Sequence, residues 1–494
     1  MQGREIAEGF TDFSLEIQQL LQGAGGSSPY LKSLIQKESV WLKSAFDHPE
    51  TCLTQEFKQL SNVAPDALSK ALRQAKRRVA LWTALCDLAG IWPLEKVTHW
   101  LTDFADLSLS LALRAALAIQ LERGKFPVGP EISDPDHLGM FVLAMGKMGA
   151  HELNYSSDID LICLFDDGRF DPKDFFQARS AFINATKKMT SLLSDLTEYG
   201  YVFRTDLRLR PNPAVTPVCM GVEAAERYYE SLGRTWERAA FIKARDASGD
   251  SKVGAAFLSS MVPFVWRKHL DFTAIEDAHN MRLQIRHHKG VGGPITVKGH
   301  DMKLGRGGIR EIEFFTQTRQ LIAGGRDADL RVLGTQHGLA ALAEKGWIEQ
   351  PLAEILSDHY RAHRTIEHRL QMINDAQTHS LPTSEEGFER LAALMGGNRE
   401  DVQKDIIQRL KEVHELTEGF FTGPAARSEP EKEDDFEEVT ASWPSYPALR
   451  SKRAVTIFDR LRPEIIRRLT ATETPQEALL AFDGFLAGLP AGVQ

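Results

Sequence analysis

The sequence predicts an α+β fold in which a small mixed sheet is flanked by an amino-terminal and a carboxy-terminal helical region. Apolar residues recur at intervals of three and four over roughly residues 5–125 and again after residue 300. Between these regions, short apolar runs of strand length end at turn residues, from about 130 to 220. The 494-residue chain has 43% apolar and 26% charged residues, which is typical of a globular protein with several domains.

Each element follows from its own pattern. Helical spacing is clearest in SPYLKSLIQKESVWLKSAF and ALSKALRQAKRRVALWTALCDL, both inside residues 1–130. The segments HLGMFVLAMGKMG, DIDLICLF and YGYVFRTDLRLRP indicate strands, and FFQARSAFINATKKMTSLLSDLTE indicates a helix that connects the last two. Helical spacing returns in IREIEFFTQTRQLI and DVQKDIIQRLKEVHELTEGFF, which predicts a second helical domain over residues 301–425.

An acidic segment marks the next boundary. Ser428–Thr440 holds seven acidic residues against one lysine, so we expect residues 426–444 to be a solvated linker. Residues 445–494 return to helical spacing and stop on an apolar stretch without a cap. We therefore expect them to be the start of a further helical domain that is cut short.

The net charge and the composition argue against nucleic acid and membrane as partners. A net charge of −9 offers no basic surface for nucleic acid, although a local basic pocket could still hold one small nucleotide. The run LSLSLALRAALAIQL is broken by Arg114 and is shorter than the roughly 18 apolar residues of a spanning helix. We expect a cytoplasmic protein with no membrane partner. The scattered cysteines, Cys52, Cys86, Cys163 and Cys219, indicate buried reduced thiols.

The segment AMGKMGAHELNYSSDIDLICLF carries the strongest chemical signal. Side chains alternate along a strand, so Asp158 and Asp160 share one face, while Ile159, Leu161 and Cys163 share the apolar face. Two converging carboxylates repel each other unless a cation lies between them, and hard oxygen ligands suit Mg²⁺ that bridges phosphates. A lone acidic pair on a strand is more often a solvated surface, but the glycine turn and the apolar back face favour a site.

A second predicted strand, YVFRTDLRLRP, repeats this arrangement. We expect one face to carry Phe203, Leu207 and Leu209, and the other to carry Arg204, Asp206, Arg208 and Arg210. Three carboxylates from two strands, with guanidinium groups beside them, meet the needs of two-metal phosphoryl chemistry. The arginines could instead be structural ion-pair partners, and Lys147 in the glycine turn could be an ordinary surface lysine.

The string KLGRGGIREIEF allows two interpretations. Gly307 and Gly308 precede a helix, so their free backbone N–H groups could meet an anion near Lys303 and Arg306, or the loop could merely turn the chain. Two residues apart on a helix, Glu311 and Glu313 face different directions, so at most one reaches a metal centre. The histidines of RHHKG, AHRTIEHRL and QTHSL lack metal-ligand spacing and indicate helix-surface or packing positions.

A glycine turn, an acid pair and a later acid-bearing strand resemble the DNA polymerase β nucleotidyltransferase superfamily. The longer strings GKMGAHELNYSSDIDLICLFD, YYESLGRTWERAAFIKAR, KLGRGGIREIEFFTQTRQLIAGGR and HRLQMINDAQTHSLPTSEEGFERLAALMG resemble, in order, the glutamine synthetase adenylyltransferase family within it. The resemblance covers at least residues 130–420. It implies a polymerase β-like nucleotidyltransferase domain over residues 131–300.

The family's full enzyme has one half that attaches AMP to a tyrosine of glutamine synthetase and one that removes it. GIREIEF and the early position of ELNYSSDIDL resemble the amino-terminal, adenylyl-removing half. The resemblance implies phosphorolysis of adenylyl-tyrosine to ADP and free tyrosine, with glutamine synthetase, phosphate and ADP or ATP as ligands and the PII signal protein and glutamine as regulators. Two alternatives stay open: transfer of AMP from ATP, and a non-catalytic module that binds PII.

The resemblance also assigns residues. Asp158, Asp160 and Asp206 are expected to be the catalytic residues and to hold two Mg²⁺ ions. Phosphate and nucleotide oxygens are expected to contact Gly146, Lys147, Ser157, Arg208, Arg210, Lys303 and Arg310.

Overall fold

The computed structural model describes residues 8–127, 134–268, 293–421 and 451–470, together with 443, 446, 449, 479, 482, 483, 485 and 486. Two compact units divide the chain, Met1–Thr417 and Glu418–Gln494. Apart from Trp443, the predicted acidic linker over residues 426–444 lies outside the described residues. The division of the first unit into two helical parts and a catalytic domain stays a prediction.

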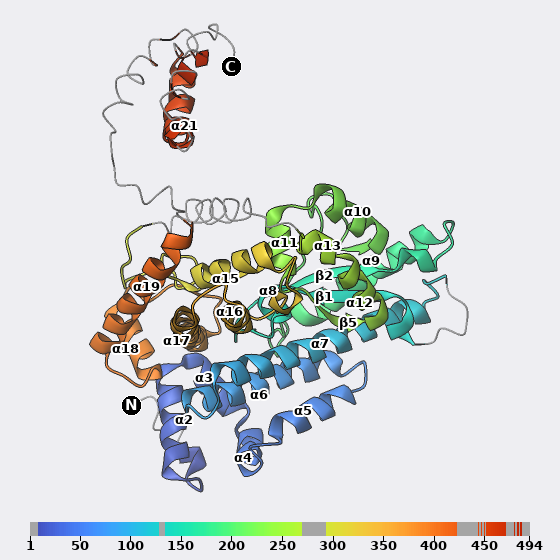
Figure 1. The fold of residues 1–494 in the computed structure, drawn as a ribbon. Helices are drawn as coiled ribbons and strands as arrows, with labels where there is room; N and C mark the ends of the chain where they lie inside the picture. Colours follow the sequence, from blue (N-terminus) through green and yellow to red (C-terminus); the bar gives the residue numbers. More distant parts are fainter. Residues whose placement is uncertain are drawn as a thin grey trace. The chain divides into compact units, whose positions relative to one another are not determined.

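Helices make up most of the first unit (Figure 1). Before the sheet the α-helices are α2 (Leu15–Ser27), α3 (Pro29–Lys37), α4 (Ser39–Asp47), α5 (Cys52–Ser61), α6 (Leu68–Leu88) and α7 (Leu94–Glu122). Within the sheet region they are α8 (Gly146–Gly149), α9 (Phe175–Ser194), α10 (Val222–Leu232), α11 (Thr235–Phe241), α12 (Ser251–Ser260) and α13 (Val262–Val265). The later helices are α15 (Ile309–Ala323), α16 (Thr335–Glu344), α17 (Gln350–Asn374), α18 (Glu385–Leu394) and α19 (Arg399–Phe421).

The sheet is small and mixed, so the predicted α+β class is confirmed. Its strands are β1 (Met140–Ala144), β2 (Ile159–Phe165), β3 (Thr205–Asp206), β4 (Cys219–Gly221) and β5 (Arg245–Gly249), in the order β3-β2-β1-β5, with β4 also paired to β2. Strand β1 is antiparallel to β2 and β5, whereas β3 and β4 are parallel to β2. The sheet therefore extends past residue 220, where the predicted strand region ended.

Both faces of the sheet are buried. Val142, Leu161 and Cys163 belong to the same apolar cluster as residues of α6, α7 and α9. Leu143 and Ile162 point to the other face and pack with residues of α10 to α13. In Figure 1, α7 lies on one side of the sheet and α10 and α13 lie on the other. The predicted apolar face of β2 is thus confirmed, and its second face is apolar as well beyond Asp160.

The predicted long strand YVFRTDLRLRP is wrong beyond Asp206. Only Thr205–Asp206 pairs with β2, and the chain turns over Leu207–Arg210. Leu207 packs with the α6, α7 and α9 side, whereas Leu209 packs with the α10 to α13 side. The two leucines pack into different hydrophobic clusters because the chain leaves the sheet after Asp206. The alternation of polar and apolar residues does not show where a strand ends.

The 29-residue α7 is the one helix within the described residues that is long and apolar enough to cross a membrane by composition. Half of its most apolar window is buried inside the fold, where α7 packs against α6, α9 and β5. A core helix of this kind meets the same hydropathy test, because it is apolar on more than one side.

The early and late helices of the first unit meet directly. Ser28 caps α3 by accepting a hydrogen bond from the Leu31 N–H at 2.9 Å, and its hydroxyl donates to the Met372 carbonyl of α17 at 2.6 Å. Helix α18 likewise packs on α2. Segments more than 300 residues apart therefore share one core, which brings α17 close to the sheet.

The second unit is described only in part. Helix α21 (Lys452–Thr470) is its main described element, and Trp443, Leu449, Leu479 and Leu486 form a small apolar cluster. Trp443 and Tyr446 both donate hydrogen bonds to Asp483, at 2.9 and 2.7 Å.

Candidate active site

Asp160 and Asp206 lie side by side at one end of the sheet. Strands β2 and β3 are parallel and place the two residues in register, because helix α9 carries the chain back between them. Burial, followed by the negative charges of Asp206 and Asp158, raises the pKa of Asp160 to about 6. The carboxylates predicted from two separate strings thus converge.

Asp158 precedes β2 and has a cationic partner. The Arg204 guanidinium donates from Nε to Asp158 Oδ1 at 2.7 Å, and also donates to the Ser156 carbonyl and the Tyr201 hydroxyl. Ser157, a predicted phosphate contact, is half-buried between Ser156 and Asp158. Arg204 therefore holds the backbone turn and one carboxylate of the trio together.

The two arginines after Asp206 differ in role. Arg208 is exposed and folds back on Asp206, with Nε 2.9 and 3.0 Å from its two oxygens, and this bond lowers the pKa of Asp206. Arg210 instead donates to the carbonyls of Leu207, Pro213 and Thr216. The Arg210 guanidinium is thus hydrogen-bonded to backbone carbonyls, whereas the Arg208 guanidinium lies beside the carboxylate of Asp206.

Gly146 allows the close approach of the glycine turn to Asp160. Its φ of +55° lies in the left-handed region, and a Cβ there would be 3.1 Å from Asp160 Oδ2. The Met145 N–H donates to the Asp160 carbonyl at 2.9 Å, which ties the turn to β2. The glycine of the predicted motif is therefore needed for space and for backbone conformation.

A cavity of about 540 Å³ opens beside Asp160. Its wall combines residues of the sheet region with residues of α11, α15 and the segment after α17. They are Gly146, Lys147, Asp160, Leu209, Trp236, Ala239, Ala240, Lys243, Lys303, Leu304, Arg310, Glu313, Phe314, Gln317, Gln377 and His379. Four cationic side chains and two carboxylates line the cavity, which favours an anionic ligand. Trp236, Gln317 and Gln377 in the same wall can contact an aromatic or hydrogen-bonding group of that ligand.

Lys303 and Arg310 lie where the sequence placed them, near the carboxylates. Both cations oppose the rise in the pKa of Asp160. Arg310 contacts Glu313 at 3.2 Å and lies over the Phe314 ring at 4.6 Å. Among the described residues no carboxylate is within ion-pair distance of the Lys303 ammonium, which leaves it available for a phosphate.

Glu313 and Glu311 point apart, as expected. Glu313 lines the cavity and accepts from Lys243 at 3.1 Å, whereas Glu311 accepts from Thr417 of α19 at 3.0 Å. Burial raises the pKa of Glu313, but the surrounding cations Lys243 and Arg310 outweigh it and hold that pKa well below its usual range. Glu313 is therefore a fixed negative charge in the cavity wall.

Lys147 is not the free cation that the sequence suggested. Its ammonium lies 2.9 Å from both oxygens of the fully buried Glu367 of α17. Burial lowers the pKa of Lys147 to about 7, although Glu367 opposes that change. Glu367 also contacts His379 Nδ1 at 2.7 Å.

His379 follows the end of α17 and lines the cavity, so it is not a helix-surface residue, whereas its role as a packing residue stays a prediction. The interpretation holds for His363 and His368, which are buried and hydrogen-bonded, whereas RHHKG lies outside the described residues. Only the folding of α17 onto the glycine turn brings His379 here, so no local sequence pattern could have identified it.

The glycine loop before α15 turns the chain. A Cβ on Gly307 would lie 1.8 Å from the Leu410 carbonyl, which shows how closely α19 packs on the loop. The N–H groups of Gly308, Ile309 and Arg310 donate to the carbonyls of Gly305, Met302 and Lys303. Of the two glycine N–H groups predicted to meet an anion, the one on Gly308 is thus already paired with a backbone carbonyl.

The carboxylate trio suits a divalent cation such as Mg²⁺. All three donors are hard oxygens, and burial together with the like charges of Asp206 and Asp158 raises the pKa of Asp160, which is an electrostatic cost that a bound cation relieves. Asp158, Asp160 and Asp206 are therefore the residues that would hold the ion.

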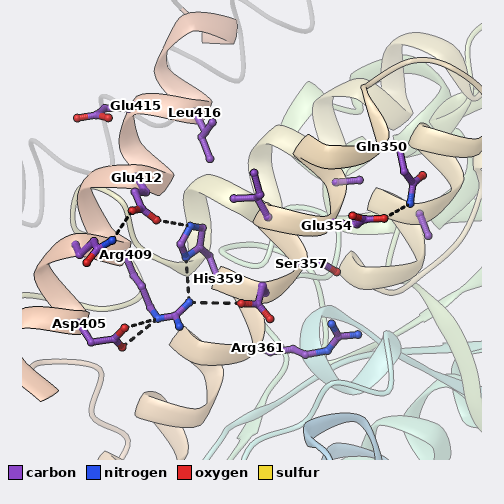
Figure 2. A pocket seen from close by; sticks show the side chains of 15 residues that line it. Gln350, Glu354, Ser357, His359, Arg361, Asp405, Arg409, Glu412, Glu415 and Leu416 are labelled. Carbon is purple, nitrogen blue, oxygen red and sulfur yellow. Dashed lines mark hydrogen bonds and ion pairs between the residues drawn. The ribbon is translucent and has the colours of Figure 1, made fainter. Parts of the chain in front are cut away.

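A larger cavity lies elsewhere, between α17 and α19 (Figure 2). It measures about 940 Å³ and contains none of the residues predicted from the sequence. Its side chains are mostly engaged with one another: Arg409 contacts Asp405 at 3.0 Å, and His359 Nε2 lies 3.1 Å from Glu412. Chemistry, and not size, therefore favours the smaller cavity as the active site.

Two family models match this chain. Residues 17–260 match the family of glutamate-ammonia ligase adenylyltransferase, and residues 278–421 match the family of GlnD PII-uridylyltransferase. The first of these ranges includes the carboxylate trio, and the second includes Lys303, Arg310, Glu367 and His379.

Similar proteins carry one shared name, bifunctional glutamine synthetase adenylyltransferase/adenylyl-removing enzyme. The protein of Bradyrhizobium diazoefficiens is 41% identical over 96% of this chain and 51% of its own length. Those of Agrobacterium fabrum and Brucella melitensis are each 40% identical over 94% of this chain and 51% of their own length. The chain spans about half the length of the curated relatives it matches.

Proposed function

Because the chain belongs to the glutamate-ammonia ligase adenylyltransferase family, whose members are nucleotidyltransferases that act on glutamine synthetase, we propose that it removes AMP from adenylylated glutamine synthetase. The reaction is phosphorolysis: an oxygen of inorganic phosphate bonds to the phosphorus of adenylyl-tyrosine, and the bond from that phosphorus to the tyrosine oxygen breaks. The products are ADP and, once the phenolate takes a proton, free tyrosine.

The observation that carries the proposal is the shared cavity of Asp160, Lys303 and Arg310. Two phosphorus centres must meet in phosphorolysis, and charge repulsion between them has to be neutralised. Lys303 and Arg310 line the same cavity as Asp160 and would supply charge-assisted hydrogen bonds to phosphate oxygens. When bound to the trio, Mg²⁺ would neutralise phosphate oxygens and favour the leaving phenolate.

In this proposal His379 donates the proton that the phenolate takes as it leaves. Glu367 lies 2.7 Å from Nδ1, and the imidazolium form of His379 can then donate the proton on Nε2 to the phenolate oxygen. Phosphate itself is already anionic at neutral pH, and phosphorolysis therefore needs an acid more than a base. Trp236 and Gln317 in the same wall are suited to contact the adenine base.

Transfer of AMP from ATP is the second candidate, because the name of the relatives covers both reactions and the same carboxylates would serve either. The strings GIREIEF and ELNYSSDIDL favour removal. A non-catalytic module is disfavoured, since Asp160 and Asp206 lie in register and Asp160 lines a cavity with several cations. The match of residues 278–421 to a PII-uridylyltransferase family supports the PII signal protein as a regulator.

The test uses adenylylated glutamine synthetase, Mg²⁺ and labelled inorganic phosphate. The proposal expects ADP with the label at its β position, at a rate that saturates with phosphate. Lys303→Ala should raise the KM for phosphate about tenfold or more, whereas Lys298→Ala, an exposed lysine nearby, should not. Release of AMP at a rate independent of phosphate would make the enzyme a hydrolase. Labelling of unmodified glutamine synthetase from ATP would establish the second candidate.

A further inference from the structure

Three potential metal ligands converge outside the cavity. His99 and Asp103 are one turn apart on α7, and His151 follows α8 directly. One ligand atom from each lies within 4.8 Å of the other two, and His99 Nε2 is 3.3 Å from Asp103 Oδ2. The rings of His99 and His151 have centroids 5.7 Å apart.

These separations suit a tetrahedral ion. Metal–ligand bonds of about 2.0–2.2 Å at the tetrahedral angle place ligand atoms about 3.4 Å apart. The pair on α7 is already at that distance, and the ligand atom of His151 lies within 4.8 Å of both. Two imidazoles with one carboxylate prefer Zn²⁺ and its neighbours in the transition series, whereas Mg²⁺ prefers all-oxygen sites such as the aspartate trio.

His151 carries two marks of a ligand. Its φ of 56° makes it one of three non-glycine residues in the left-handed region within the described residues. Such a conformation costs roughly 1–3 kcal/mol and is retained where the surroundings require it. Its Nδ1 atom is buried and has no hydrogen-bond partner, which is a cost that a metal ion would remove.

The surrounding charges permit a cation. The nearby Arg245 guanidinium is paired with Asp106 at 2.9 Å, which offsets its positive charge.

We propose that His99, Asp103 and His151 form a binding site for one divalent transition-metal ion of the Zn²⁺ class, separate from the carboxylates of the active site. The ion joins the first three turns of α7, the longest helix among the described residues, to the segment that leaves the glycine turn. The next residue, Glu152, accepts from Lys243 in the cavity wall at 2.8 Å, so the metal braces the segment on which that wall rests.

The test is zinc binding to the full chain by calorimetry, with thermal unfolding in parallel. His99→Ala and His151→Asn each remove one ligand, and asparagine tolerates the left-handed backbone. Both variants should bind one Zn²⁺ fewer per chain than the wild type, or bind it at least tenfold more weakly, and should lose the zinc-dependent rise in midpoint. His48→Ala, an exposed histidine elsewhere, should retain both.

Two further measurements separate this site from other zinc ligands. Asp160→Asn alters the catalytic trio, so the site should still take up its zinc in that variant. Co²⁺ should produce visible d–d absorption in the wild type that His99→Ala removes. Unchanged stoichiometry and affinity in both histidine variants would overturn the assignment, as would loss of the same zinc in His48→Ala or Asp160→Asn.

Discussion

The Lys147 ammonium lies 2.9 Å from both carboxylate oxygens of Glu367, a residue 220 positions later in the chain. The ion pair joins the glycine turn after β1 to helix α17, and it is almost fully shielded from solvent. Lys147 lines the cavity, so the pair is both a structural link and part of the wall.

Removing one partner of this pair should be costly. Lys147→Met and Glu367→Gln should each lower the free energy of unfolding by about 1–3 kcal/mol, because each removes a buried charge-assisted contact. Arg364 at 3.2 Å and His379 at 2.7 Å still neutralise Glu367 when Lys147 is replaced. The double variant should lose clearly less than the sum of the two, which denaturant unfolding at constant pH would measure as a coupling energy. Additive losses would mean that the two groups do not interact.

Asp160→Asn should abolish turnover and stabilise the protein in the absence of divalent ions. The pKa of Asp160 is about 6 in the folded chain against an ordinary 3.8, so the folded state binds the extra proton between roughly pH 4 and 6. Stability is therefore lost as pH rises through that window. Asparagine avoids this loss, and at pH 7.5 the gain should be at most about 3 kcal/mol and should vanish below about pH 4.

Asp158→Asn supplies the contrast, because Asp158 is paired with Arg204 at 2.7 Å. It should also abolish turnover but lower stability by about 1 kcal/mol. Thermal unfolding across pH, with the exposed Asp171→Asn as control, measures both effects. Equal stability changes in the two variants would contradict the different environments of these carboxylates.

The two arginines that follow Asp206 should separate activity from stability. Arg210→Ala leaves three carbonyls without their donor and should lower the free energy of unfolding by about 1–3 kcal/mol. Arg208→Ala removes an exposed side chain, so its unfolding midpoint should stay within about a degree while kcat/KM falls tenfold or more. The reverse pattern would show that Arg210 is the substrate contact.

His379→Asn should lower kcat by about 10²–10⁴-fold, because the proton donor to the phenolate is lost. The KM for phosphate should change little. The exposed His137→Asn should leave kcat and KM unchanged. If His379→Asn keeps the wild-type kcat and loses only stability, His379 is a packing residue.

Local pattern was sufficient for the features that depend on strand and helix periods. The alternation of Asp160 with Leu161 places one side chain at the site and the other in the core, and this follows from a strand period of two. The opposed directions of Glu311 and Glu313 follow in the same way from the helix period. The α+β class, with its sheet between two helical regions, rests on the same periods.

Tertiary structure decided what each charged side chain contacts. Lys147 and Arg210 look alike in sequence as cations near an acid pair, yet one is paired with α17 and the other with backbone carbonyls. His379 enters the cavity only because α17 packs against the glycine turn. The sequence by itself therefore determined the fold class and the carboxylate trio, since local periods encode both. The contacts of Lys147, Arg210 and His379 depend on which distant segments pack beside them. A strand or helix period describes only neighbours in sequence, so it does not predict these contacts.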